Sequence, residues 1–156
     1  MSGPGHTPPA GPGATPPPAA VRTPPSAAGR LEPYGARVAL RAERQPLDPE
    51  GFLVTLVEDL AAASVAAGAS VIGHIKCLLR TQDGVFTCNL TSVRTGAAVR
   101  RQGDTTVPAV LRTGESAELE IAVLVYDLSA ETIAALLEQG LRRLLDPQGC
   151  RWSKQV

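Results

Sequence analysis

The stretch from Val71 to Val93 constrains the fold more than any other part of the chain. It reads VIGHIKCLLRTQDGVFTCNLTSV, with an Asp-Gly pair between two runs of β-prone residues. Asp-Gly between such runs is a strong short-range signal of a β-hairpin. We therefore predict an antiparallel hairpin with a type I′ turn at Asp83-Gly84, in which Gln82 faces Val85.

The side chains of a strand alternate between its two faces, so this register sorts the hairpin into an apolar face and a mainly polar face. The predicted inner face carries Val71, Ile75, Cys77, Leu79, Phe86, Cys88 and Leu90. The predicted outer face carries Ile72, His74, Lys76, Leu78, Arg80, Thr87, Asn89 and Thr91. A slip of one residue would exchange the two faces, so the pattern specifies the register as well.

The remaining segments supply further strands and two helices. Residues 34–44 and 117–126 alternate as half-buried strands do, and residues 105–112 are a candidate edge strand. Helix starts are predicted at Asp48 and Ser129, each of which is a good N-cap. The predicted fold is an α+β two-layer sandwich of order β-α-β-β-(β)-β-α, with both helices on one face of a mostly antiparallel sheet.

Composition divides the 156 residues into three segments. Residues 1–33 hold ten of the fourteen prolines, so we expect a disordered tail there. Residues 34–146 are the predicted α+β domain, and residues 147–156 are expected to be a flexible C-terminal tail. The N-terminus lacks the apolar region of a signal peptide, so we expect a cytoplasmic protein that does not contact a membrane.

The three cysteines are Cys77, Cys88 and Cys150. The predicted register makes Cys77 and Cys88 diagonal neighbours on the inner face, at or beyond the reach of a disulfide, so both are expected to be buried thiols. Cys150 falls in the predicted tail and is expected to react fast. These cysteines lack the ligand spacing of zinc sites, and the chain has no phosphate loop or dinucleotide fingerprint. We therefore expect neither a metal nor a cofactor.

His74 and Lys76 are the only candidates for catalytic residues. A histidine beside a lysine on a rigid strand can act as a general base. The same side chains can equally belong to a solvated sheet face with cross-strand ion pairs. An enzyme centred on this pair is therefore an alternative hypothesis, and a protein without enzymatic activity is the favoured one.

Nucleic-acid binding is a second alternative, through a predicted basic loop over residues 94–101 with Arg94, Arg100 and Arg101. From residue 48 to residue 145 the element order of helix, three main strands and helix resembles that of double-stranded-RNA-binding domains, which implies binding to RNA. Those domains have a run of lysines at the start of the final helix, whereas this chain reads SAET from Ser129. The formal net charge of zero provides no global attraction to nucleic acid.

The outer sheet face carries the leading hypothesis. Apolar and charged side chains share this face, with more apolar surface than a monomer usually exposes in one patch. Either another subunit covers the face, or the C-terminal tail or residues 94–112 cover it within one chain. We predict an accessory or interaction module that associates with itself or with another protein through Ile72, His74, Lys76, Leu78, Arg80, Glu118, Glu120, Leu124 and Tyr126.

Overall fold

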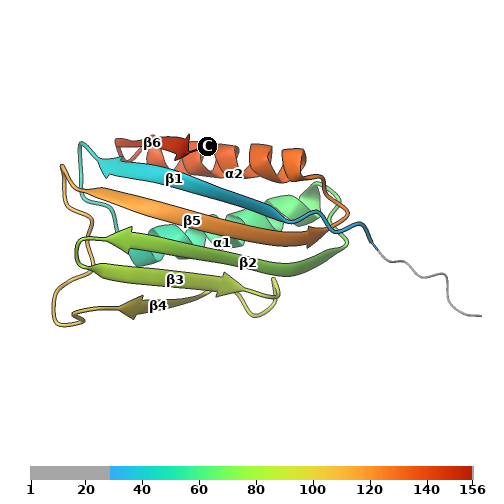
Figure 1. Ribbon diagram of the computed structural model, residues 1–156, viewed down its shortest axis with the longest axis horizontal. Coiled ribbons are helices and arrows are strands. Elements are labelled where there is room, and N and C mark those ends of the chain that lie inside the picture. Colours follow the sequence, from blue (N-terminus) through green and yellow to red (C-terminus); the bar gives the residue numbers. More distant parts are fainter. Residues whose placement is uncertain (1–28, 156) are drawn as a thin grey trace, which may run out of the picture.

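The computed structural model describes residues 29–155, which form six strands and two helices (Figure 1). The strands are β1 (Tyr34–Ala42), β2 (Val71–Thr81), β3 (Gly84–Leu90), β4 (Ala98–Gln102), β5 (Ser116–Tyr126) and β6 (Cys150–Gln155). The helices are α1 (Pro49–Ala66) and α2 (Ala130–Leu145). Residues 1–28 of the predicted proline-rich tail lie outside the described residues.

All six strands belong to one antiparallel sheet in the order β4-β3-β2-β5-β1-β6. The strands β1 and β2 run parallel with β5 between them, and β5 and β6 run parallel with β1 between them. Each helix connects one of these parallel pairs, which is the split β-α-β arrangement of ferredoxin-like folds. The β3–β4 hairpin extends the sheet beyond β2.

Both helices pack on the same face of the sheet, which confirms the predicted α+β sandwich (Figure 1). The core between the two layers includes the fully buried side chains of Leu53, Leu79, Phe86 and Leu137. The strands β1 and β6 each belong to one of the two split β-α-β arrangements. Both strands lie outside residues 48–145, the range compared with double-stranded-RNA-binding domains. The resemblance to double-stranded-RNA-binding domains therefore rested on an incomplete set of elements.

The helix starts agree with the sequence prediction. The Asp48 side chain accepts a hydrogen bond of 3.1 Å from the backbone N–H of Glu50, and Pro49 opens α1. The Ser129 hydroxyl accepts a hydrogen bond of 3.1 Å from the backbone N–H of Thr132 at the start of α2. Both caps satisfy backbone donors that have no partner within the helix.

The turn between β2 and β3 differs from the prediction. Thr81 pairs with Gly84, so Gln82 and Asp83 occupy the turn. A type I′ turn requires positive φ at both central residues. Among the described residues Asp127 is the one non-glycine residue with positive φ, so the predicted turn type is wrong. The shifted register keeps the two faces but changes the partner of every residue in the hairpin.

A β-bulge at Gly73 reverses the predicted faces at the start of β2. Ile72 and His74 pair with adjacent residues of β5, which leaves Gly73 as an extra residue. Ile72 is therefore buried, and Val71 is 54% exposed, the opposite of the prediction. A Cβ atom on Gly73 would lie 3.0 Å from the carbonyl oxygen of Leu124, so the close approach of β5 explains the glycine.

The two edge strands also correct the prediction. Residues 147–156 were expected to be flexible, but Cys150–Gln155 forms β6 and pairs with β1. The Trp152 indole donates a hydrogen bond of 3.0 Å to the Asp146 carboxylate. At the opposite edge the strand is β4, whereas residues 105–112 form a loop tied to Leu47 by backbone hydrogen bonds at Leu111.

Candidate functional site

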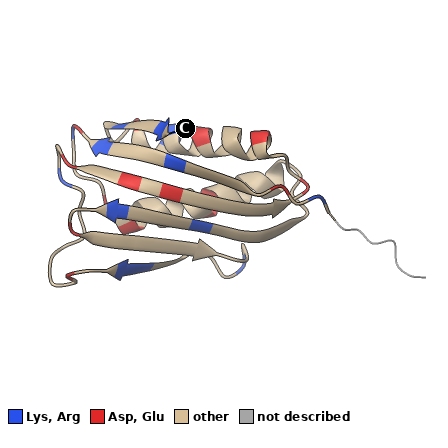
Figure 2. Cartoon of the chain, in the orientation of Figure 1, with Lys and Arg blue, Asp and Glu red and all other residues tan. Residues whose placement is uncertain are grey.

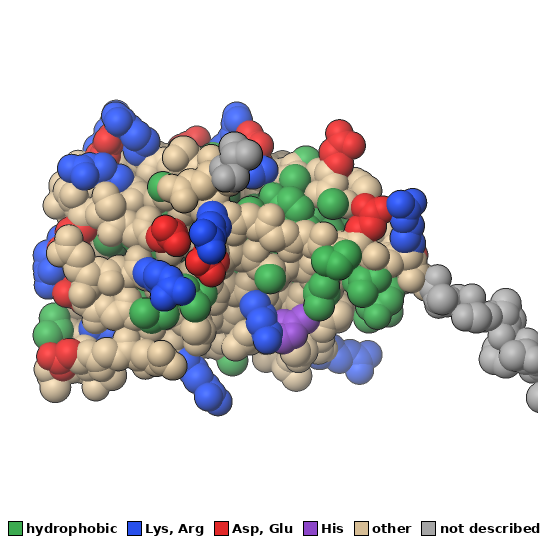
Figure 3. Space-filling view, in the orientation of Figure 1, with side chains coloured by type: hydrophobic (Ala, Val, Ile, Leu, Met, Phe, Trp, Pro, Cys, Tyr) green, Lys and Arg blue, Asp and Glu red, His purple; other side chains and the backbone are tan. Residues whose placement is uncertain are grey.

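The sheet face opposite the helices is the candidate site, and we call it the open face. The strands β4 and β6 lie at the two edges of the sheet and do not cross this face. Among the described residues, neither 94–112 nor 147–155 covers the open face, so the alternative of intramolecular cover by these segments is wrong. Figure 3 views the molecule from this side, with the helices behind the sheet.

Charged residues lie along the middle strands of the sheet (Figure 2). The basic ones on the open face are Arg37, Arg41, Lys76, Arg80, Arg100 and Arg151, and the acidic ones are Glu43, Glu118 and Glu120. Arg37 lies 3.5 Å from Glu120, and Arg151 lies 3.2 Å from Glu43. The open face therefore carries a net positive charge, although the whole chain is neutral.

A hollow of about 820 Å³ lies in the middle of this face. Its floor includes Gly35 and Ala122, which pair with one another across β1 and β5. Because neither residue has a long side chain, the larger side chains around them form the sides of the hollow. Arg37 and Lys76 contribute to the lining from the two sides of that floor.

An apolar cluster lies at one end of the open face, and we call it the end cluster. It consists of Leu31, Val71, Leu124 and Tyr126, which are brought together by the pairs Leu31–Tyr126 and Val71–Tyr126. Leu31, Val71 and Leu124 are 40%, 54% and 38% exposed. Apolar side chains gather at this end of the face in Figure 3.

Asp127 fixes the segment that carries Leu31. Its carboxylate accepts a hydrogen bond of 2.9 Å from the Arg30 backbone N–H, and its own N–H donates to the Arg30 carbonyl at 2.7 Å. The Ser70 hydroxyl also donates to this carboxylate. Asp127 has φ of 68°, a conformation that aspartate tolerates better than most residues. These contacts hold Leu31 against the end of β5.

Eight of the nine residues predicted for the interface lie on the open face, and Ile72 is the exception. Sequence reasoning missed Leu31 and Val71 of the end cluster. Val71 is exposed only because of the bulge at Gly73, and Leu31 precedes β1 in a segment without strand periodicity. One feature of the sequence could have indicated the bulge, namely a glycine inside a strand pattern.

The geometry gives little support to the catalytic hypothesis for His74 and Lys76. Both side chains lie on the open face, in register with Leu124 and Ala122 of β5. The Nε2 atom of His74 is buried and has no hydrogen-bond partner among the described residues. A general base in an active site is normally oriented by a third group. The described chain supplies no such group to Nε2.

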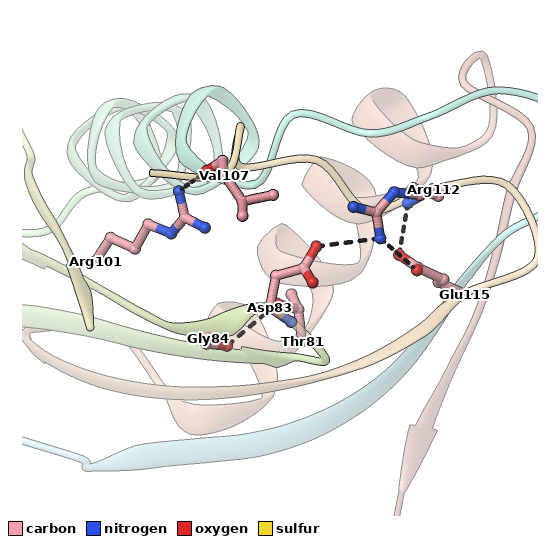
Figure 4. Close-up of polar contacts among 7 residues, drawn as sticks. All are labelled: Thr81, Asp83, Gly84, Arg101, Val107, Arg112 and Glu115. Carbon is pink, nitrogen blue, oxygen red and sulfur yellow. Dashed lines mark hydrogen bonds and ion pairs between the residues drawn. The ribbon is translucent and has the colours of Figure 1, made fainter. Parts of the chain in front are cut away.

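The structure separates the three arginines of the predicted nucleic-acid site. Arg94 lies in the loop after β3, Arg100 lies on the open face, and Arg101 points to the helix side of β4. The Arg101 guanidinium lies 5.6 Å from the Phe86 ring centre and donates a 2.6 Å hydrogen bond to the Val107 carbonyl (Figure 4). Its Nε and Nη2 atoms are buried, so phosphate cannot reach them.

A second set of polar contacts holds the loop before β5. Arg112 lies 3.4 Å from Asp83 in the β2–β3 turn and 3.0 Å from Glu115 (Figure 4). The hydrogen bond from the Arg112 backbone N–H lowers the pKa of Glu115, and the Arg112 guanidinium lowers it further. Arg101 and Arg112 thus bind the loop to the end of the sheet and away from the open face.

All three cysteines are buried. Cys77 lies directly opposite Cys88 in the observed register, instead of diagonal to it. Burial raises the pKa of the Cys77 thiol far above its ordinary range, and the neighbouring Cys88 adds to this. Burial, with a contribution from Glu58, raises the pKa of Cys88 to about 11. Burial also raises the pKa of Cys150, which lies in β6 and not in a tail.

We expect all three thiols to react slowly with iodoacetamide in the native protein and rapidly in urea, because buried neutral thiols are poor nucleophiles. The raised pKa values favour the protonated form in the folded state. The stability that they contribute is complete below pH 9 and is lost as pH rises through about 11 for Cys88. A Cys88→Ala variant should lose less stability over this interval. Fast native labelling of Cys150 would contradict its place in β6.

No helix in the described part of the chain is long and apolar enough to cross a membrane. The residues from 29 to 155 contain no group of three or more His, Cys, Asp or Glu side chains that could hold a metal ion. No family model, curated protein or solved structure matches this chain.

Proposed function

We propose that this chain is a non-enzymatic interaction module that binds another protein surface on its open face. The observation that carries the proposal is the end cluster, three of whose members are more than a third exposed on a sheet face that residues 29–155 leave uncovered. Exposed apolar clusters with a polar surround mark protein interfaces. Tyr126 gives the cluster an aromatic side chain of the kind that dominates binding energy in such interfaces.

Nucleic-acid binding has weaker support. Glu118 and Glu120 lie on the central strand β5 and would repel phosphate in the middle of the face. Tyr126 is the one aromatic side chain on the open face within the described residues, whereas single-strand binders use several aromatic side chains to stack bases. The burial of Arg101 removes one of the three predicted phosphate contacts.

Site-specific photo-crosslinking tests whether the open face meets a partner. A benzoylphenylalanine at Asn89, which is exposed on this face, should form a covalent adduct of discrete mass in the native cells. The same group at Val65, which is 51% exposed on α1, is the matched control and should form none. An adduct of twice the chain mass identifies a second copy, and any other discrete mass identifies an unlike protein. No adduct from Asn89, or equal adducts from both positions, would refute the proposed function.

A further inference from the structure

Three cations on the open face lie on neighbouring strands and have no ionic partner in the part of the chain that the structure describes. Lys76, Arg80 and Arg100 are exposed, and none of them forms an ion pair with another residue between 29 and 155. The sheet register places Leu78 and Thr87 between them, with Arg100 opposite Thr87. Four residues along a strand separate the Cα atoms of Lys76 and Arg80 by about 13 Å. We call these residues the basic triangle.

The part of the open face formed by β2, β3 and β4 bears no carboxylate of its own. Glu118 is the acidic residue that faces Arg80 across the strands, and it lies on β5. By contrast, the layer of helices is mainly acidic, with Glu50, Glu58, Asp59, Glu131 and Glu138 against Arg142 and Arg143. The two sides of the molecule therefore differ in the sign of their charge.

The distribution of charge between the two sides of the molecule restricts which surfaces can bind to the open face. A second copy that packed face to face would bring two positively charged surfaces together, and like charges across an interface disfavour association. A partner with carboxylates would instead meet unpaired cations at the triangle. The end cluster and Leu78 would at the same time need apolar side chains opposite them.

The geometry points to an unlike protein whose docking segment is acidic and carries apolar side chains among its carboxylates. This inference rests on the proposed function and specifies the partner's chemistry. The carboxylates pair with Lys76, Arg80 and Arg100, and the apolar side chains cover Leu78 and the end cluster. The purified chain is then expected to form no face-to-face dimer, since its own positively charged open face repels a second one.

A short fluorescent peptide in which glutamates alternate with leucines and glycines is the probe for this chemistry. Fluorescence anisotropy should detect its binding at low ionic strength and a weaker affinity at higher salt, because exposed charges are screened. Reversing two cations in Lys76→Glu/Arg80→Glu should weaken binding by about tenfold or more. The matched control Arg94→Glu reverses an exposed cation off the open face and should change little.

Four results would overturn the inference. Equal binding of a peptide with glutamine in place of glutamate would show that the carboxylates are not recognised. Tighter binding of oligodeoxythymidylate at the same residues would show a phosphate site instead. Absence of binding by the acidic peptide would exclude the proposed chemistry. Self-association of the purified chain through Asn89 contacts would assign the face to a second copy, and the proposed function would then stand while this inference failed.

Discussion

Replacing Phe86 with alanine is expected to lower the free energy of unfolding by about 3–5 kcal/mol. Phe86 is completely buried on the inner face of β3, opposite the equally buried Leu79. Its removal leaves a cavity that a regular sheet under two helices cannot easily close. The Arg101 guanidinium also loses the aromatic ring beneath it, while its Nε and Nη2 atoms remain buried without partners.

Val85→Ala is the matched control, since Val85 is the preceding residue and lies on the opposite, open face. Val85 is only partly buried, so we expect its replacement to lower the free energy of unfolding by about 1 kcal/mol or less. Urea denaturation of both variants measures the difference. Equal costs for the two substitutions, or a larger cost at Val85, would contradict the observed register of β3.

The sequence predicted the layer architecture because periodicity reports which side chains are buried. The strands β1, β2, β3 and β5 alternate clearly, and the two helices have caps and apolar stripes. The edge strands were not predicted because they are short and polar: β4 reads AVRRQ and β6 reads CRWSKQ. An edge strand is fixed by the neighbour to which it adds, and a single sequence does not identify that neighbour.

The errors near the site arose from local backbone geometry. The hairpin register depended on the turn. Asp83-Gly84 was predicted as the central pair, whereas Gln82 and Asp83 occupy the turn. The faces predicted for Val71 and Ile72 were exchanged because Gly73 is an extra residue in β2. Alternation predicts faces only while the pairing is regular, so a bulge reverses every assignment beyond it.

The position of Leu31 could not be predicted from periodicity either. It lies beside Tyr126 because Asp127 binds the backbone of Arg30, a contact between residues almost a hundred positions apart. Long-range hydrogen bonds of this kind leave no local pattern in the sequence. The end cluster therefore became visible only in the folded chain.

Leu124→Asn should release the partner from the open face. Placing a polar amide where an interface buries an apolar side chain is expected to cost about 2 kcal/mol or more, which is about thirtyfold in affinity. An asparagine adds no charge, so the loss does not depend on the sign of the partner's charge. The substitution lies on the outside of β5, and we expect the free energy of unfolding to change by less than about 1 kcal/mol.

The most direct measurement is the size-exclusion elution of the tagged protein from native cell extract. The wild-type chain is expected to elute in a complex larger than a monomer, and Leu124→Asn is expected to elute as a folded monomer. The matched control Val65→Asn, which changes an exposed apolar side chain on α1, should elute with the wild type. A wild-type chain that elutes as a monomer, or a complex that survives Leu124→Asn unchanged, would contradict the assignment of the open face as a protein-binding surface.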